Sequence, residues 1–315
     1  MPKDPFNAYR NAGEPDVTVA PSDPILSNMS SGTPSKIMEG RSLAKRLLAE
    51  AAAEVNAMQS KRGVTPTLAT VLVGDDLASH TYVKMKRKRC EQVGMNSVAI
   101  ELPRDTSTQQ VLDEIRRLAD DESVHGILVQ HPVPRPIDRR AVFEAIPIEK
   151  DVDGVTSATL GRTILGMPAF ASCTPAGIMR LLAEYKVELD GAHAVVVGRS
   201  PILGRPMASM LINAHATVTL CHSRTRNLPD IVRHADVLIV AVGKPRFAQG
   251  DWIKPGAVVI DCGYNVGTIG DVDFDAVIER ASLVTPVPGG VGPMTIATLI
   301  RQTTDAAALQ LGTDC

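Results

Sequence analysis

The stretch VVVGRSPILGRPMASML, residues 195–211, decides the fold of the second half of the chain. A strand pattern is followed by a glycine turn and then by a helical pattern. Gly198 stands at the first position of a dinucleotide-binding fingerprint, Ser200 replaces the second glycine, and Gly204 lies one residue late for the third. The free N–H groups and positive dipole end of the following helix suit a pyrophosphate. A plain strand–turn–helix of another α/β fold is the alternative, and the turn alone does not separate the two.

The wider pattern of the chain alternates strands and helices. In the second half, strands are expected at 192–198, 216–223, 236–243 and 257–263, a rhythm of about 20 residues that is typical of a dinucleotide-binding fold. In the first half, strands at 67–74, 97–102 and 125–130 alternate with helices at 35–58, 78–94 and about 107–120. Such a series predicts a parallel sheet covered by helices. Residues 147–172 read as loop, and a helix over about 174–185 connects the halves.

We therefore expect an α/β protein of two domains with a cleft between them. The proline-rich residues 1–35 are expected to form a disordered extension, since they hold six of the 22 prolines and show no periodicity. An N-terminal α/β catalytic domain is expected over 36–155, joined by a C-terminal helix over 291–312. A Rossmann-type domain is expected over 156–290.

Composition limits the classes of function. A hydrophobic content of 44% and a net charge of -2 describe a soluble globular protein without attraction to polyanions. No apolar run approaches the roughly 20 residues of a membrane helix. The five cysteines are scattered and form no CxxC pair, which indicates reduced thiols in a cytoplasm and neither a disulfide framework nor a metal site.

The end of the strand at 216–223 bears on the choice of cofactor. An NAD site usually places an acid there for the ribose hydroxyls, whereas this chain has Ser223 and Arg224 and no acid. Arg199 in the glycine turn adds a second cation. These residues favour NADP, whose extra phosphate they would bind. The alternative is that both arginines are ordinary solvated surface residues.

One lysine of the basic segment HTYVKMKRKRC, residues 80–90, falls on the apolar side of its helix. At about 100° per residue, Lys86 lies within the stripe formed by Val83, Cys90 and Val93, whereas the other cations face solvent or lie at its margin. Burial would lower the pKa of Lys86 toward values useful for proton transfer. Tyr82, one turn earlier, shares its face. The alternative is snorkelling, in which the amine reaches water.

Polar residues follow the strand at 125–130, where ligands bind in open α/β sheets. Gln130 ends that strand and His131 follows it. The loop EKDVDG then carries Asp151 and Asp153. Each carboxylate either caps a turn or accepts hydrogen bonds from N–H donors at the edge of a ligand ring.

The segment TPVPGGVGPMT, residues 285–295, precedes the last helix. Its prolines and glycines specify a rigid loop, poor in side chains, that a ligand can approach closely.

Together these segments resemble one family, the bifunctional methylenetetrahydrofolate dehydrogenase/methenyltetrahydrofolate cyclohydrolases. The resemblance is carried by VLVGDDLASHTYVKMKRKRCEQVGM, GILVQHPVP, PIEKDVDGVTSATLGR, CTPAGIMRLL, HAVVVGRSPILGRPMASML, ATVTLCHSRT, WIKPGAVVIDCGYN and TPVPGGVGPMT. It implies NADP-dependent oxidation of 5,10-methylenetetrahydrofolate to the methenyl form, hydrolysis of that product to 10-formyltetrahydrofolate, and a homodimer.

The resemblance also implies roles for individual residues. The catalytic set would be Lys86, Tyr82, Gln130 and Asp153, where Gln130 tunes the lysine and Asp153 binds the pterin. The cofactor contacts would be Gly198, Arg199, Ser200, Ser223 and Tyr264. Substrate contacts would be Tyr82, Lys86, Val129, Gln130, His131, Asp153, Pro288, Gly289, Gly290, Val291, Gly292, Pro293 and Met294.

Three residues depart from the family pattern: His131 stands where an apolar residue is usual, Leu77 where proline is usual, and Tyr264 where isoleucine is usual. His131 therefore puts the ratio of the two activities in doubt. Two other functions stay open. An amino-acid or shikimate-type dehydrogenase would share the two-domain plan, and a nucleic-acid-binding module would use Lys84 to Arg89. The net charge and the ten aromatic residues argue against the second.

Overall fold

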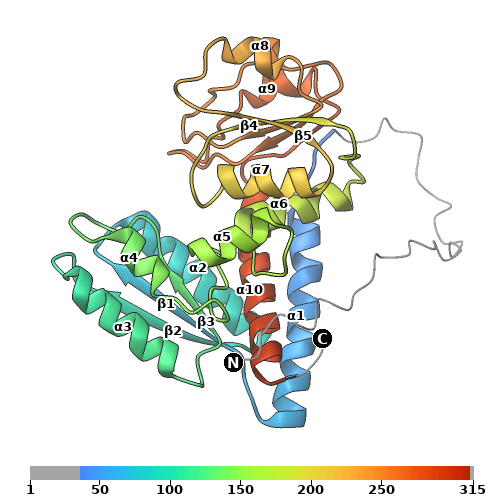
Figure 1. Ribbon diagram of the computed structural model, residues 1–315. Coiled ribbons are helices and arrows are strands. Elements are labelled where there is room, and N and C mark those ends of the chain that lie inside the picture. Colours follow the sequence, from blue (N-terminus) through green and yellow to red (C-terminus); the bar gives the residue numbers. More distant parts are fainter. Residues whose placement is uncertain (1–35, 313–315) are drawn as a thin grey trace, which may run out of the picture.

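The fold comes from a computed structural model that describes residues 36–312, so the expected extension 1–35 lies outside the described residues. Two parallel β-sheets form the two halves of the molecule (Figure 1). This arrangement confirms the expected α/β fold of two domains. The exact boundaries at 155/156 and 290/291 stay predictions.

The first sheet has the strand order β2-β1-β3. Its central strand β1 (Thr67–Val73) pairs in parallel with β2 (Asn96–Leu102) and β3 (Gly126–Val129). Every residue of β1 is buried, which agrees with its mostly apolar sequence TLATVLV. Helices α2 (Leu77–Val93), α3 (Thr108–Asp120) and α4 (Arg139–Glu144) belong to this half. A capping box between Ser107 and Gln110 fixes the start of α3.

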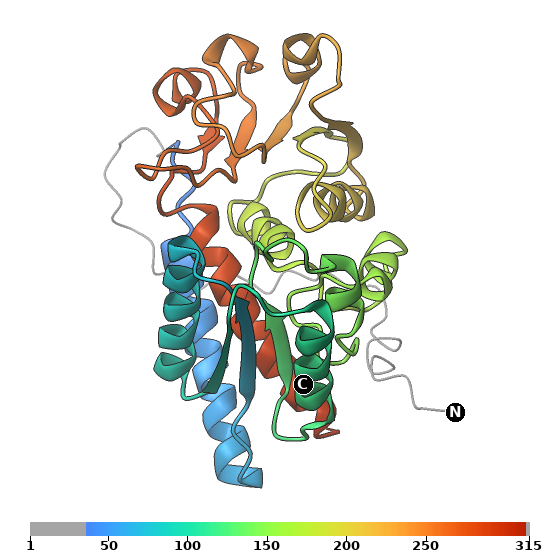
Figure 2. The same cartoon turned by 90° about the vertical axis from the view of Figure 1, so that its left-hand side faces the viewer.

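Two long helices from opposite ends of the described chain lie side by side, as Figures 1 and 2 show. They are α1 (Arg41–Arg62) and α10 (Val291–Gln310). Arg301 of α10 pairs with Glu54 of α1 at 2.5 Å and with Asp305 at 2.8 Å. The C-terminal helix therefore packs beside α1, the first helix of the described chain.

The second sheet has the order β5-β4-β6-β7-β8. Its strands are β4 (His193–Val197), β5 (Thr217–Cys221), β6 (Val237–Val240), β7 (Val258–Asp261) and β8 (Leu283–Val284). Around it lie α6 (Cys173–Glu184), α7 (Gly204–Asn213), α8 (Leu228–Val232), α9 (Phe274–Ile278) and the short 3₁₀ helix η2 (Gly250–Trp252). Because β4 has β5 on one side and β6 on the other, the strand order switches at the end of β4, where ligands of such folds bind.

The loop expected over 147–172 is partly wrong, because α5 (Ser157–Ile164) forms within it. Side-chain capping starts this helix: the Thr156 hydroxyl accepts a hydrogen bond from Thr159 N at 3.1 Å. The sequence prediction also missed α4, α8, α9 and η2, and the two-residue strand β8, all of which are short. Within residues 36–312, no helix has the length and apolar character needed to cross a membrane.

Candidate active site

The geometry of α2 separates the basic residues of its segment. Asp76 accepts a hydrogen bond from Ser79 N at 2.8 Å and fixes the start of the helix. Val83, Cys90 and Val93 are buried in the core, as predicted. By contrast, the side chains of Lys84, Arg87, Lys88 and Arg89 are exposed, and Lys86 is half-buried. The predicted placement of Lys86 on the inner face is confirmed.

The amine of Lys86 meets the amide that ends β3. Its Nζ donates a hydrogen bond to Oε1 of Gln130 at 2.9 Å, and Gln130 Nε2 donates to the carbonyl of His131 at 2.7 Å. The amine thus bonds to a protein side chain, contrary to the snorkelling alternative. Burial lowers the pKa of Lys86, and the negative charge of Asp153 opposes that shift. A neutral amide binds the amine without restoring its preference for the charged form.

The two aspartates of EKDVDG have different surroundings. The carboxylate of Asp151 accepts from Val155 N and Thr156 N, each at 3.0 Å, and from Thr159 Oγ1 at 2.7 Å, so it caps a turn. Burial raises the pKa of Asp153, and the positive charge of Lys86 opposes this effect. The turn-capping alternative therefore holds for Asp151, whereas the Asp153 carboxyl interacts electrostatically with the Lys86 amine.

Sequence reasoning missed two residues next to Asp153. The thiol of Cys173, at the start of α6, donates to the Val152 carbonyl at 3.2 Å and also interacts with the Asp153 carboxyl. Gln302 of α10 donates to the same carbonyl at 2.7 Å. The segment CTPAGIMRLL contains Cys173, but no sequence pattern links Cys173 or Gln302 to Asp153, because both lie outside the loop that carries this aspartate.

His131 and Tyr82 each pack against another aromatic ring. The imidazole of His131 packs edge-on against Phe143, with ring centroids 4.7 Å apart, and its buried Nε2 has no hydrogen-bond partner among residues 36–312. Burial, together with the charges of Arg139 and Lys86, lowers the pKa of His131 to about 4. Tyr82 meets Tyr264 edge-to-face at 6.0 Å. Tyr264, one of the three residues that depart from the family pattern, thus connects the second half of the protein to helix α2.

The glycine turn requires both of its glycines. Gly198 has a φ of 129°, and a Cβ there would lie 2.2 Å from the Ala241 carbonyl oxygen. A Cβ on Gly204 would lie 1.9 Å from the carbonyl oxygen of Gly198. The displaced third glycine therefore still permits close packing of helix against strand. Ser200 Oγ accepts a hydrogen bond from Leu203 N at 3.1 Å in this turn.

The other expected cofactor residues lie at the same edge of the second sheet. Arg199, Ser200, Ser223 and Arg224 are exposed, and their turns follow the paired parallel strands β4 and β5. Further along this edge, the buried carboxylate of Asp271 accepts from Val242 N at 2.6 Å and Gly243 N at 2.8 Å, which fixes the loop after β6.

The glycine-proline loop mixes buried and exposed residues. Gly289, Gly290 and Val291 are buried, Pro293 is half-buried, and Pro288 and Gly292 are exposed. The Gly289 carbonyl accepts from Gly40 N at 2.9 Å, which ties the loop to the start of α1. The side chains of Met294 and Val129 are fully or almost fully buried in hydrophobic cores. These two side chains therefore lie in the core, whereas Pro288 and Gly292 of the predicted substrate set are exposed.

The fold and site define a two-domain α/β protein of the dinucleotide-dependent oxidoreductase class, with a half-buried lysine in its N-terminal half. The catalytic-domain model of the tetrahydrofolate dehydrogenase/cyclohydrolase family matches residues 38–153, and its NAD(P)-binding-domain model matches residues 172–311. The chain belongs to this family.

Relatives match over nearly their whole lengths. The bifunctional protein FolD 1 of Streptomyces avermitilis is 57% identical over 284 residues, which are 90% of this chain and 99% of that protein. The FolD methylenetetrahydrofolate dehydrogenase/cyclohydrolase structure from Campylobacter jejuni is 44% identical, has a TM-score of 0.84, and matches over 86% of this chain and 98% of that one. The Trypanosoma brucei dehydrogenase-cyclohydrolase, solved with NADP and an inhibitor, is 37% identical with a TM-score of 0.83 and covers 86% and 96% of the two chains.

The similarity to shikimate-type dehydrogenases, the alternative function, is limited to the fold. Shikimate dehydrogenase from Aquifex aeolicus is 16% identical with a TM-score of 0.51, over 81% of this chain and 95% of that chain.

Proposed function

We propose that this protein oxidises 5,10-methylenetetrahydrofolate with NADP and hydrolyses the methenyl product to 10-formyltetrahydrofolate. The observation that carries the proposal is the bond between the Lys86 amine and Gln130 at 2.9 Å, within a chain that belongs to the dehydrogenase/cyclohydrolase family. A half-buried amine of lowered pKa supplies the base that hydrolysis near neutral pH needs.

The residues of the second sheet fit NADP. Side-chain atoms would collide with backbone at Gly198, so the turn presents bare backbone to a pyrophosphate. Arg199 and Arg224 are exposed at the ends of neighbouring strands and would hold the 2'-phosphate, while Ser200 and Ser223 offer hydroxyls. When bound, the cofactor accepts the hydride. Tyr264 would help to position the two ligands, because its ring contacts Tyr82.

Hydrolysis would use the residues around Lys86 in the N-terminal half. As water forms a C–O bond to the methenyl carbon, Lys86 would take its proton, and the ring C–N bond then breaks with the proton returned to the released nitrogen. Gln130 would orient the amine, and Asp153 would bind the N–H donors of the pterin. Tyr82, on the same helical face as Lys86, would pack against the substrate.

An absorbance assay of the purified full-length protein tests the function. We expect the methenyl product to form from methylenetetrahydrofolate with NADP and to disappear by hydrolysis. No methenyl product with either NADP or NAD would refute the dehydrogenase activity. Unchanged methenyltetrahydrofolate in a separate assay would refute the cyclohydrolase activity.

We also propose a cytoplasmic homodimer that binds no nucleic acid. The family resemblance supports the dimer, and the scattered cysteines and net charge of -2 support the other two expectations. Sedimentation would measure the mass in solution, and a salt titration with DNA would contradict the proposal if it revealed steep, salt-dependent binding.

A further inference from the structure

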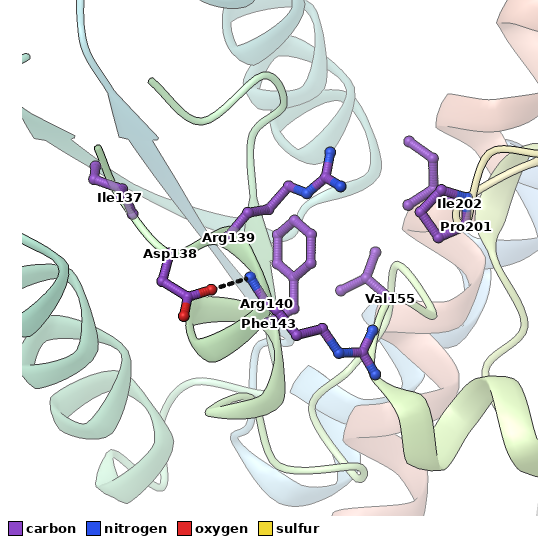
Figure 3. A pocket seen from close by; sticks show the side chains of 8 residues that line it. All are labelled: Ile137, Asp138, Arg139, Arg140, Phe143, Val155, Pro201 and Ile202. Carbon is purple, nitrogen blue, oxygen red and sulfur yellow. Dashed lines mark hydrogen bonds between the residues drawn. The ribbon is translucent and has the colours of Figure 1, made fainter. Parts of the chain in front are cut away.

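A cavity of about 310 Å³ lies between the catalytic half and the glycine turn of the second half (Figure 3). One wall comes from α4 and its neighbours, and the other comes from Pro201 and Ile202. These two residues lie between Gly198 and Gly204 in the sequence. The cavity therefore adjoins the place where the cofactor would bind, on the side of the other domain.

Two adjacent arginines of α4 line this cavity, and they differ in their partners. Arg140 pairs with Glu144 one turn along the helix. The nearby carboxylate of Asp138 accepts hydrogen bonds from Arg140 N at 2.9 Å and Ala141 N at 3.1 Å, so it caps α4. Arg139 makes no ion pair or hydrogen bond through its guanidinium within the described part of the chain. Its charge is therefore available to a ligand.

The surroundings of Arg139 favour an anion. In Figure 3 its side chain extends over Phe143 toward the side on which Pro201 and Ile202 lie. The remaining wall residues, Ile137 and Val155, are apolar, and apolar walls reduce the screening of charge by water. The neighbouring imidazole of His131 stays neutral, since burial and the charges of Arg139 and Lys86 lower its pKa. No carboxylate of the cavity wall pairs with Arg139.

We propose that Arg139 is a further cofactor-binding residue, which binds a phosphate oxygen of NADP from the catalytic domain while the glycine turn binds the pyrophosphate from the other side. The cofactor would then bridge the two domains. This inference rests on the proposed function, because it assumes NADP as the cofactor. An anion is the chemistry that an unpaired guanidinium recognises.

The test compares Arg139→Ala with Arg140→Ala in the full-length protein. Both variants remove an exposed cation from the same cavity. Arg140 pairs with Glu144, whereas Arg139 has no ion-pair or hydrogen-bond partner in the described part of the chain, so Arg140→Ala is the matched control. We expect Arg139→Ala to raise the KM for NADP and the Kd of NADP in calorimetry by roughly 5- to 20-fold. Arg140→Ala should stay within about twofold of wild type. Arg139→Lys should recover part of the affinity, and the salt dependence of NADP binding should weaken in Arg139→Ala.

The cofactor-independent hydrolysis serves as the internal control. Retained cyclohydrolase activity in Arg139→Ala would show that the variant is folded and that its folate site is intact. An unchanged Kd for NADP, or an equal loss in both arginine variants, would overturn the proposal. If Arg139→Ala raised only the KM for the folate, this result would also overturn the proposal. The cavity would then bind the carboxylates of the substrate. Calorimetry with NADP needs neither reaction, so a failure of the proposed function is seen separately in the wild-type assays.

Discussion

Replacing Lys86 by Met tests the role of the half-buried amine most directly. Methionine keeps an unbranched side chain of similar length but removes the donor to Gln130 Oε1, which lies 2.9 Å from Nζ. Gln130 keeps its other bond, from Nε2 to the His131 carbonyl at 2.7 Å, so the amide should stay in place. The change therefore removes the base and leaves the rest of the site largely intact.

The expected loss follows from the chemistry of proton transfer. A positioned general base contributes about 10²- to 10⁴-fold in rate, which corresponds to roughly 3–5.5 kcal/mol of activation free energy. Cyclohydrolase kcat should fall by this factor. NADP affinity should not change, because the expected cofactor residues lie at the edge of the second sheet. The free energy of unfolding should change by only about 1 kcal/mol, since the variant loses one hydrogen bond but no longer buries an amine.

The assay follows the decay of methenyltetrahydrofolate absorbance, corrected for uncatalysed hydrolysis. Lys88→Met is the matched control, because Lys88 is an exposed cation of the same helix. It should hydrolyse the substrate at the wild-type rate. Hydrolysis by Lys86→Met within a factor of three of wild type would refute the assignment of the base. An equal loss in Lys88→Met would show that general disruption of α2 is responsible.

Three further variants test the neighbouring groups. Wild-type cyclohydrolase activity should rise with pH through the lowered pKa of Lys86. Gln130→Glu places a carboxylate beside the amine and should move this rise to higher pH by about 1–3 units. An unshifted pH profile in this variant would contradict the coupling between residue 130 and Lys86. His131→Leu should reduce the loss of stability in acid, since the folded pKa of about 4 lies below the ordinary value of about 6.5 and stability falls as pH decreases between these values. The difference should reach about 2 kcal/mol between pH 7 and pH 5 in urea unfolding, and equal slopes for both proteins would count against burial of the imidazole. Tyr264→Ile removes the edge-to-face contact with Tyr82, which is worth about 0.5–1.5 kcal/mol, and should raise the KM for methylenetetrahydrofolate roughly two- to tenfold. Tyr264→Phe keeps the ring and should match the wild-type KM. Identical KM values in the two variants would exclude the ring contact as the cause.

The sequence by itself determined the features that depend on local pattern. Runs rich in apolar residues predicted the buried strands β1, β3, β4, β6 and β7 because both faces of a covered parallel sheet are dry. Helical periodicity placed Lys86 among Val83, Cys90 and Val93 because the positions of side chains around a helix follow from spacing alone. The same logic failed for α5, whose first turn depends on the Thr156 cap rather than on an apolar stripe.

Only the tertiary structure decided which distant residues meet. Gln130 lies 44 residues from Lys86, so no local pattern gives the direction of its amide oxygen. The Tyr82–Tyr264 contact, and a guanidinium of Arg139 that has no partner within residues 36–312, likewise depend on how separate elements pack. The physical reason is that hydrogen bonding, burial and charge depend on distances in space, and the chain sets these distances only after the two sheets and the helices α1 and α10 have packed together.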